Sequence, residues 1–123
     1  MTQYKIAKYD KNDCLLCRSG KTVLGQVNVR DLRDEYFGGY VIWNLHVYPK
    51  YRNQGVAGEL IECILKSYKD APIFIDAEPF YDEGGPTSEE LHAWYLSLGF
   101  SVWNNKEKNP NGNWLVIGNF TTS

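Results

Sequence analysis

The residues from Leu45 to Gly58 carry the clearest signal for chemistry in this sequence. A strand-like segment ends at Pro49, and a polar loop then leads through Arg52 and Gly55 into a helical pattern. The first turn of a helix leaves backbone N–H groups unpaired at the positive end of the helix dipole, so a loop of this kind can bind an anion. The candidate residues are Arg52, Asn53, Gln54, Gly55, Val56, Ala57 and Gly58.

The glycines of this loop have two interpretations. In the first, Gly55 lets an anion approach the backbone, and Arg52 and the neighbouring amides surround a pair of phosphates. In the second, Gly55 only forms the loop, and Gly58 lets the helix lie close to a sheet. Two other phosphate-binding patterns, GxxxxGK[ST] and GxGxxG followed by an acidic residue, do not occur.

The cysteines and histidines give little support for a metal or redox site. Cys14 and Cys17 form a C-x-x-C pair in a strand-like segment, where positions three apart point to opposite faces. His46 and His92 lack the spacing of metal ligands. The sequence therefore predicts no metal site. The three cysteines are an odd number, which does not suggest a set of disulfides and is typical of a reducing compartment.

Length and composition limit the class of protein. The 123 residues are 43% hydrophobic and 15% aromatic, which is enough for a single domain over residues 1–123 and not for two. With 13 basic and 15 acidic residues the formal charge is −2, so bulk electrostatics do not favour nucleic acid. No apolar run resembles a membrane span or a signal peptide, so we expect a cytoplasmic protein that does not bind membranes. A homodimer is compatible with these features.

The first half of the chain has the pattern of strands. Period-two alternation and turn residues predict four strands, with a turn at Asn12-Asp13 and a loop over residues 31–39. The predicted strands cover residues 4–9, 14–18, 22–29 and 40–48. In the third, Val23, Gly25, Val27 and Val29 share a face. In the fourth, Val41, Trp43, Leu45 and Val47 are expected on one face and Ile42, Asn44, His46 and Tyr48 on the other.

The second half changes to a helical period. An apolar stripe predicts a helix over residues 56–68, which is followed by a short strand over residues 73–77 that runs parallel to the fourth. Thr87-Ser-Glu-Glu90 has the form of a capping box and opens a second helix that ends before Gly99. Strands at residues 100–103 and 113–120 close the chain. This order predicts an α/β fold with a mixed sheet built around one β-α-β unit.

Two short motifs resemble the GNAT family of N-acetyltransferases. Arg52-Asn-Gln-Gly-Val-Ala57 is similar to the family's R/Q-x-x-G-x-G/A pyrophosphate loop, and Trp94-Tyr-Leu-Ser-Leu-Gly-Phe100 is similar to its aromatic-Tyr-x-x-Leu-Gly-Phe signature. They occur in the family's order, with a helix and a strand between them. The resemblance spans residues 40–103. It implies a largely antiparallel sheet with one central parallel unit and a V-shaped cofactor cleft, here with the N-terminal helices reduced or absent.

The resemblance implies acetyl-CoA as the co-substrate. Its pyrophosphate would lie on the amides of residues 53–57, and its pantetheine arm would bond to the strand edge at Leu45, His46 and Val47. In the family this strand diverges from the next one, often at a β-bulge. Diverging strands expose unpaired backbone groups that an amide-bearing arm can satisfy.

The resemblance also implies direct attack of a primary amine, on a small molecule or a protein, on the acetyl thioester. The N–H near Val47 would polarise the carbonyl, and Tyr95 would protonate the departing thiolate. Many relatives carry a carboxylate where this sequence has Asn44, whose amide is not a base at neutral pH. The base therefore stays open, and the candidates that could act through water are His46, Asp76 and Glu78.

The acceptor side is less defined. The family usually has two helices between its first two strands, where only residues 10–13 intervene here. Acidic residues near the predicted cleft favour a cationic acceptor such as a lysine side chain, a polyamine or an aminoglycoside, unless they form only a solvated loop. These residues are Asp76, Glu78, Asp82, Glu83, Glu89 and Glu90. The alternative to an enzyme is a catalytically silent module that keeps the fold and binds CoA or a protein partner.

Overall fold

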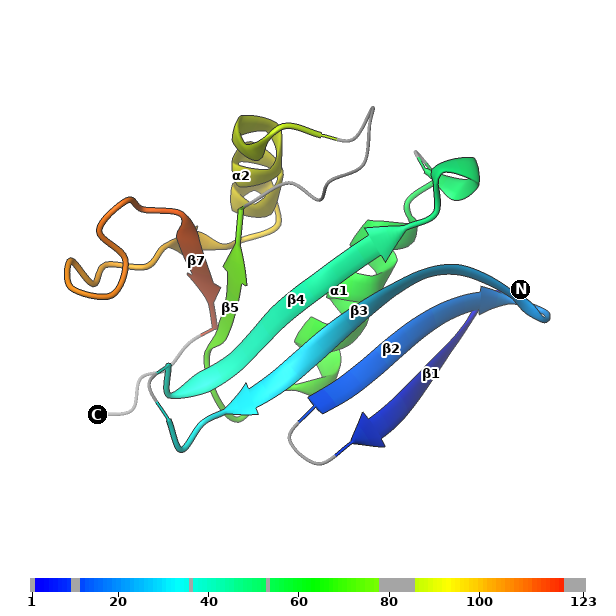
Figure 1. Ribbon diagram of the computed structural model, residues 1–123, viewed down its shortest axis with the longest axis horizontal. Coiled ribbons are helices and arrows are strands. Elements are labelled where there is room, and N and C mark those ends of the chain that lie inside the picture. The colour runs from blue at the N-terminus through cyan, green and yellow to red at the C-terminus, as the bar shows by residue number, and fades with distance from the viewer. Residues whose placement is uncertain (1, 10–11, 36, 53, 78–85, 119–123) are drawn as a thin grey trace.

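The protein forms one mixed β-sheet with two helices (Figure 1). The computed structural model describes residues 2–9, 12–35, 37–52, 54–77 and 86–118, with the backbone alone for residues 2–9. Its elements are β1 (Thr2–Tyr9), β2 (Asn12–Ser19), β3 (Thr22–Leu32), β4 (Gly39–Val47), a 3₁₀ turn (Pro49–Tyr51), α1 (Val56–Ser67), β5 (Ile73–Asp76), α2 (Ser88–Ser97), β6 (Ser101–Val102) and β7 (Trp114–Ile117).

The sheet has the strand order β1-β2-β3-β4-β5-β7-β6. β1 to β4 form an antiparallel meander, β4 and β5 run parallel and are joined by α1, and β7 pairs antiparallel with both β5 and β6. The predicted mixed sheet around one parallel unit is therefore confirmed. Only residues 10 and 11 separate β1 from β2, so the two helices usual in the family are missing from this place.

Helix α1 covers one face of β2, β3 and β4. Its predicted apolar stripe is confirmed, because Val56, Leu60, Ile61 and Ile64 are buried in the core. Close packing at the start of the helix depends on Gly25 of β3, where an added Cβ would lie 3.1 Å from a Val56 methyl group and 2.9 Å from the His46 carbonyl oxygen.

A β-bulge interrupts β4 at Asn44. The pairing with β3 slips by one residue between Trp43 and His46, and Asn44 has a φ of 54°. Because of the extra residue, Ile42 and Leu45 both face the core that α1 covers. The expectation that Leu45 and Trp43 share a face is therefore wrong. Trp43 and Asn44 are both exposed, while Leu45 is buried.

Other boundaries also differ from the sequence prediction. Asn12 and Asp13, predicted as a turn, begin β2 and pair with β3. The loop expected over residues 31–39 is shorter, because β3 runs to Leu32 and two turn hydrogen bonds lead into β4. A second bulge, between β2 and β3, places Leu24 rather than Val23 against the core. Neither described helix has the length and apolarity that crossing a membrane requires.

Helix α2 begins with the predicted capping box. The Glu90 N–H donates to Thr87 Oγ1 at 3.1 Å, and the Thr87 N–H donates to Glu90 Oε1 at 3.0 Å. Gly99, with a φ of 108°, ends the helix as predicted. The loop after β6 is fixed by buried Asn109, whose side chain bonds to the backbone of Trp103 and Trp114.

Candidate functional site

The strands β4 and β5 separate after a short parallel pairing, and we call the region between the diverging strands the cleft. The two strands pair only from Tyr40 to Ile42 on β4 and from Ile73 to Ile75 on β5. Beyond Ile42 they diverge, and the bulge at Asn44 falls at this point (Figure 1). The V-shaped divergence of the two strands expected from the resemblance is therefore present, and it widens toward the end of β4 that leads into α1.

The backbone of Val47 faces this cleft. The next residue, Tyr48, donates its N–H to the Leu24 carbonyl of β3 at 3.1 Å. Successive residues of a strand direct their backbone groups to opposite sides, so the N–H and C=O of Val47 point away from β3, toward the diverging side. By the same alternation Leu45 presents its backbone to the cleft, whereas His46 turns its backbone toward β3. Of the three residues predicted to bind the pantetheine arm, Leu45 and Val47 thus direct their backbone N–H and C=O groups into the cleft, and His46 does not.

The start of α1 has the features of an anion site. Gly55 precedes the helix in a left-handed conformation with a φ of 81°, and no side chain among the described residues caps the helix. The first intrahelical bond runs from the Glu59 N–H to the Gly55 carbonyl, so the N–H groups of Val56, Ala57 and Gly58 have no acceptor within the helix. A Cβ at Gly55 would meet nothing within 4 Å, which leaves the approach to these groups open.

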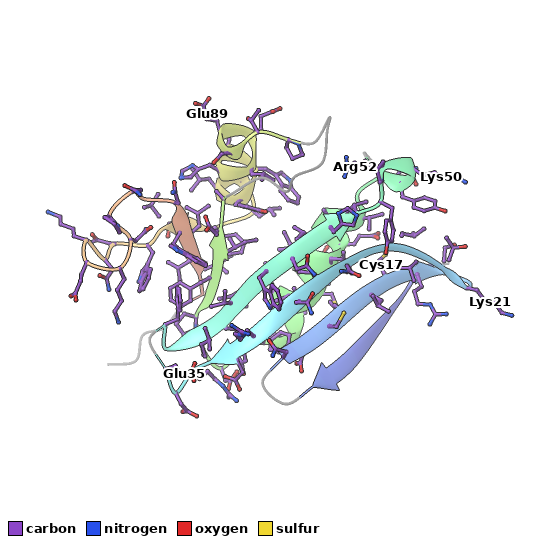
Figure 2. All side chains as sticks on the ribbon, in the orientation of Figure 1. Cys17, Lys21, Glu35, Lys50, Arg52 and Glu89 are labelled. Carbon is purple, nitrogen blue, oxygen red and sulfur yellow. The ribbon has the colours of Figure 1, made fainter. Side chains whose placement is uncertain are left out.

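Arg52 lies in the loop between β4 and α1. Its Nε donates to the Val47 carbonyl oxygen at 3.0 Å, which holds the guanidinium beside the cleft. Figure 2 shows Lys50, in the 3₁₀ turn, and Arg52, directly after it, at the same end of β4. Gln54 donates from its side chain to the Lys50 carbonyl at 3.5 Å, and the predicted contact Asn53 lies outside the described residues. The loop therefore gathers positive charge beside the uncapped helix end.

Gly58 has a different neighbour from the one considered in the sequence. An added Cβ would lie 3.8 Å from the Trp94 ring of α2, which is ordinary contact. Close approach of α1 to the sheet instead depends on Gly25, opposite Val56. The second interpretation of this glycine, that it brings the helix onto the sheet, is therefore wrong.

Tyr95 of α2 lies in the core beside the far wall of the cleft. The side chain is 2% exposed and contacts the rings of Trp94 and Phe100. Burial raises the pKa of the Tyr95 phenol well above its usual range, and the negative charge of Asp76, the last residue of β5, raises the pKa further. The phenol therefore stays protonated at neutral pH, which is the state that a general acid requires.

The other candidate catalytic residues come from β4. The Asn44 side chain donates to Asn28 Oδ1 at 3.1 Å, on the face of the sheet away from α1. The His46 ring lies edge-on to Tyr48, with 5.1 Å between ring centroids. The candidate base Glu78 lies outside the described residues, as do Asp82 and Glu83. Glu89 and Glu90 are exposed in the first turn of α2, where Glu90 belongs to the capping box.

Metal ligands and cavities add nothing to this site. Within the described ranges, no three His, Cys, Asp or Glu side chains gather as a metal ion needs. Cys14 and Cys17 lie on β2 as predicted, with Cys17 buried, and neither is in a disulfide bond. A cavity of about 520 Å³ is formed by residues 102–106 and 109–112 of the loop before β7, and no predicted site residue lines it.

Two residues near the bulge of β4 were not identified as candidate site residues from the sequence. Trp43 is 45% exposed, and the Arg30 guanidinium of β3 lies 5.6 Å from the centroid of its ring. Their proximity depends on the register of β3 against β4 and on the bulge. An asparagine in the middle of an apolar strand is the one signal of that bulge, since asparagine tolerates positive φ better than most residues.

Comparison with known proteins places the chain among acetyltransferases. Residues 10–102, which are more than half of the chain, match the family model described as Acetyltransferase (GNAT) domain. No curated protein sequence gave a match. Among solved structures, an acyl-CoA N-acyltransferase from Pseudomonas aeruginosa matches with a TM-score of 0.62 and 19% identity over 88% of this chain and 67% of that protein.

Two further solved structures have the same fold. One, from Bacteroides thetaiotaomicron, is described as a putative GNAT-family acetyltransferase, and it matches with a TM-score of 0.64 and 16% identity over 92% of this chain and 65% of that protein. The other is a GNAT-family acetyltransferase from Elizabethkingia anophelis with acetyl-CoA bound, with a TM-score of 0.59 and 20% identity over 89% of this chain and 77% of that protein. The chain spans about two thirds of the length of the Pseudomonas and Bacteroides proteins.

Proposed function

The chain belongs to the acetyltransferase (GNAT) domain family, and from this premise we propose that it binds acetyl-CoA in the β4–β5 cleft and transfers the acetyl group to a primary amine. The amine belongs to a small molecule or to a protein. One observation carries the proposal: the uncapped start of α1, behind a left-handed Gly55, follows the same end of β4 as the Val47 N–H, which points away from β3.

Each part of the cofactor has a matching group on the protein. The pyrophosphate lies on the free N–H groups at residues 56–58, where the helix dipole and the Arg52 guanidinium offset its charge. The pantetheine arm then runs back along β4 and bonds to the N–H of Val47 and the carbonyl of Leu45. It takes the place of a paired strand where β5 has diverged.

The reaction uses groups on the two walls of the cleft. The amine nitrogen attacks the thioester carbon, the C–S bond breaks, and the Tyr95 phenol gives its proton to the departing sulfur. The N–H of Leu45, which also faces the cleft and lies nearer than Val47 to its closed end, stabilises the negative oxygen of the tetrahedral intermediate. The amine loses a proton, which passes through water to Asp76. A proton returned from Asp76 then reprotonates the Tyr95 phenolate, so the protein ends in its starting state. Asn44 does not act as a base, because its amide is bonded to Asn28 and does not accept a proton at neutral pH.

A second candidate is a catalytically silent module that keeps CoA binding. The specific observation in its favour is Asn44, an amide at the position where many relatives carry the carboxylate base. In this case acetyl-CoA binds and no amine is acetylated.

The test of the proposal is calorimetric titration with acetyl-CoA of the wild type and of Gly55→Ala. The added methyl group would occupy the open approach to the helix N-terminus. We expect about a tenfold or greater loss of affinity, because hydrogen bonds to a charged group contribute about 1.5–3 kcal/mol. Failure of the wild type to bind acetyl-CoA at millimolar concentration would overturn both candidates.

The chain provides a matched control in Gly20→Ala. Gly20 has a φ of 62° in the β2–β3 hairpin, and a Cβ there also meets nothing within 4 Å. Both variants carry similar backbone strain, about 1–2 kcal/mol, but only Gly55 lies at the anion site. Equal loss of affinity in the two variants would show that the effect is general destabilisation. Acetyl transfer to a panel of amines then separates the enzyme from the silent module.

A further inference from the structure

The β-bulge creates an exposed patch on the sheet face opposite α1. Two consecutive residues of β4, Trp43 and Asn44, point to this face, and β3 contributes Asn28 and Arg30. We call these four side chains the bulge patch. Trp43 is 45% exposed, although large aromatic side chains are usually well buried. An exposed indole beside a guanidinium and two amides offers both an apolar surface and polar groups to a ligand.

Arg30 is the charge of the bulge patch. Its Nε donates to Asn12 Oδ1 at 3.2 Å, and its guanidinium lies over the Trp43 ring, so two contacts fix its position. Among the described residues no carboxylate lies within ion-pair distance of it, whereas nearby Arg33 pairs with both Asp31 and Asp70. The terminal nitrogens of Arg30 thus remain available to a carboxylate, which an arginine binds with two parallel hydrogen bonds.

The bulge patch lies next to the acyl end of the bound cofactor. A cofactor held at the start of α1 runs back along β4 from Val47 toward the point where the cleft begins. That point is Ile42, the last residue of β4 paired with β5, and Trp43 and Asn44 follow it directly. An acceptor on the bulge patch therefore has its amine close to the thioester.

Sheet register relates Arg30 to the proposed proton acceptor. Arg30 lies opposite Val41, and Val41 lies opposite Phe74 of β5, so the three residues form a row across the sheet. Asp76 is two residues beyond Phe74 and points to the same side of its strand. Strand spacings put the Cα atoms of Arg30 and Asp76 at least about 12 Å apart, because β5 diverges from β4 beyond Ile75. The positive and negative groups therefore lie at opposite ends of a site whose width suits a small molecule.

We propose that the bulge patch binds the acceptor, and that the acceptor is an amine that also carries a carboxylate. The carboxylate bonds to the Arg30 guanidinium, the carbon skeleton lies on the Trp43 indole, and the amine points toward the thioester and Asp76. This inference rests on the proposed function, and it defines a substrate class for the same site. It replaces a purely cationic acceptor, because a polycation would place positive charge beside Arg30.

The experiment compares acceptors that differ only in charge. Suitable pairs are 4-aminobutanoate with 4-aminobutanamide, and 6-aminohexanoate with its amide, because their amines have similar basicity. We expect kcat/KM for the acid to exceed that for the amide at least about fivefold in the wild type, and Arg30→Gln to reduce the ratio to within about twofold. Lys69→Gln removes the same charge from another exposed site and should leave the ratio unchanged.

A second measurement does not depend on turnover. The indole N–H signal of Trp43, assigned by its loss in Trp43→Phe, is followed by NMR during titration with each acid and its amide, with and without CoA. We expect the acid to shift this signal at lower concentration than the amide, and Arg30→Gln to abolish the difference. Folding of each variant is confirmed by the rest of the spectrum.

The outcomes separate this inference from the proposed function. A wild type that acetylates amides as well as acids, or an Arg30→Gln variant that loses activity equally toward both, overturns the carboxylate site and leaves the acetyltransferase intact. A protein that binds no acetyl-CoA overturns the proposed function. In that case the indole titration still decides whether the bulge patch recognises a carboxylate, and the absence of an acid-specific shift overturns it.

Discussion

Arg52 Nε donates a hydrogen bond to the carbonyl oxygen of Val47 at 3.0 Å. This contact ties the loop before α1 back to the last residue of β4, across the mouth of the cleft. It fixes the guanidinium on the side where an anion at the helix N-terminus would lie. The same bond occupies the Val47 carbonyl, so the N–H of Val47 is the group of this residue left for the cofactor.

Arg52→Ala should weaken acetyl-CoA binding more than it destabilises the fold. We expect the dissociation constant to rise tenfold or more, because a charge-assisted contact is lost, and the free energy of unfolding to fall by less than about 1 kcal/mol. Calorimetry and urea denaturation measure the two effects. Arg52→Lys keeps the charge without the Nε donor, so an affinity between those of the wild type and Arg52→Ala is expected. An unfolding free energy that falls as much as the binding free energy would contradict the anion site.

Tyr95→Phe should lower kcat without changing acetyl-CoA affinity. Loss of a general acid typically costs a factor of 10² or more, while the ring still fills the same place in the core. Because the pKa of Tyr95 is raised, the phenol stays protonated through neutral and mildly alkaline pH, and kcat should not fall for this reason below about pH 10. A Tyr95→Phe variant with wild-type kcat would exclude this residue as the acid.

Asp76→Asn should lower the pKa of Tyr95. The carboxylate is the second cause of the raised value, after burial, so the pKa is expected to fall and yet to stay above that of free tyrosine. Ultraviolet titration of tyrosinate, with Tyr95→Phe subtracted to isolate the signal, measures it. An unchanged titration would show that the Asp76 charge does not reach the phenol. If Asp76 also accepts the amine's proton, the variant loses kcat at every pH.

Asn44 provides a test of the bulge. Asn44→Ala and Asn44→Gly both remove the hydrogen bond to Asn28, so the comparison isolates the effect of positive φ. Alanine carries about 1–2 kcal/mol of strain in this conformation, which outweighs the smaller unfolded-state entropy that it offers over glycine. We expect Asn44→Gly to be the more stable variant by up to about 1 kcal/mol in chemical denaturation. A more stable Asn44→Ala would mean that residue 44 does not have a left-handed conformation.

The capping box of α2 should give a pH-dependent contribution to stability. Thr87→Ala is expected to cost about 1 kcal/mol, as is usual at a helix N-cap. The backbone N–H of Thr87 lowers the pKa of Glu90. The Glu90 carboxylate therefore stabilises the folded state above its ordinary pKa near 4.5, and the contribution is lost as the pH falls through the lowered value. In Glu90→Gln this acid-side dependence should disappear from thermal denaturation curves.

Local patterns predicted those elements whose own residues determine them. The apolar stripe and the preceding glycine defined α1 to within one residue at its end, and the Thr87–Glu90 spacing defined the start of α2. The bulge at Asn44 escaped prediction because an alternating pattern does not indicate where one extra residue enters a strand. The wrong predictions of which β4 side chains share a face all follow from that extra residue.

The site divides in the same way. The loop around Gly55 and the position of Tyr95 are contained in contiguous motifs, so the sequence located both. Arg30 and Trp43 are 13 positions apart, and only the pairing of β3 with β4 brings them together. A contact that arises from register has no signature in either segment alone.

The short parallel pairing of β4 with β5 divides the sheet into two groups of strands. Within the sheet, three residue pairs connect strands β1 to β4 with strands β5, β7 and β6. At that closed end the Tyr40 N–H donates to the Pro72 carbonyl at 2.7 Å, and its hydroxyl donates to Asp70 at 2.7 Å. A ligand that bonds to both β4 and β5 at the open end would connect the two groups of strands at a second place. Hydrogen exchange in β5 and β7 should then slow more than in β2 when the cofactor binds.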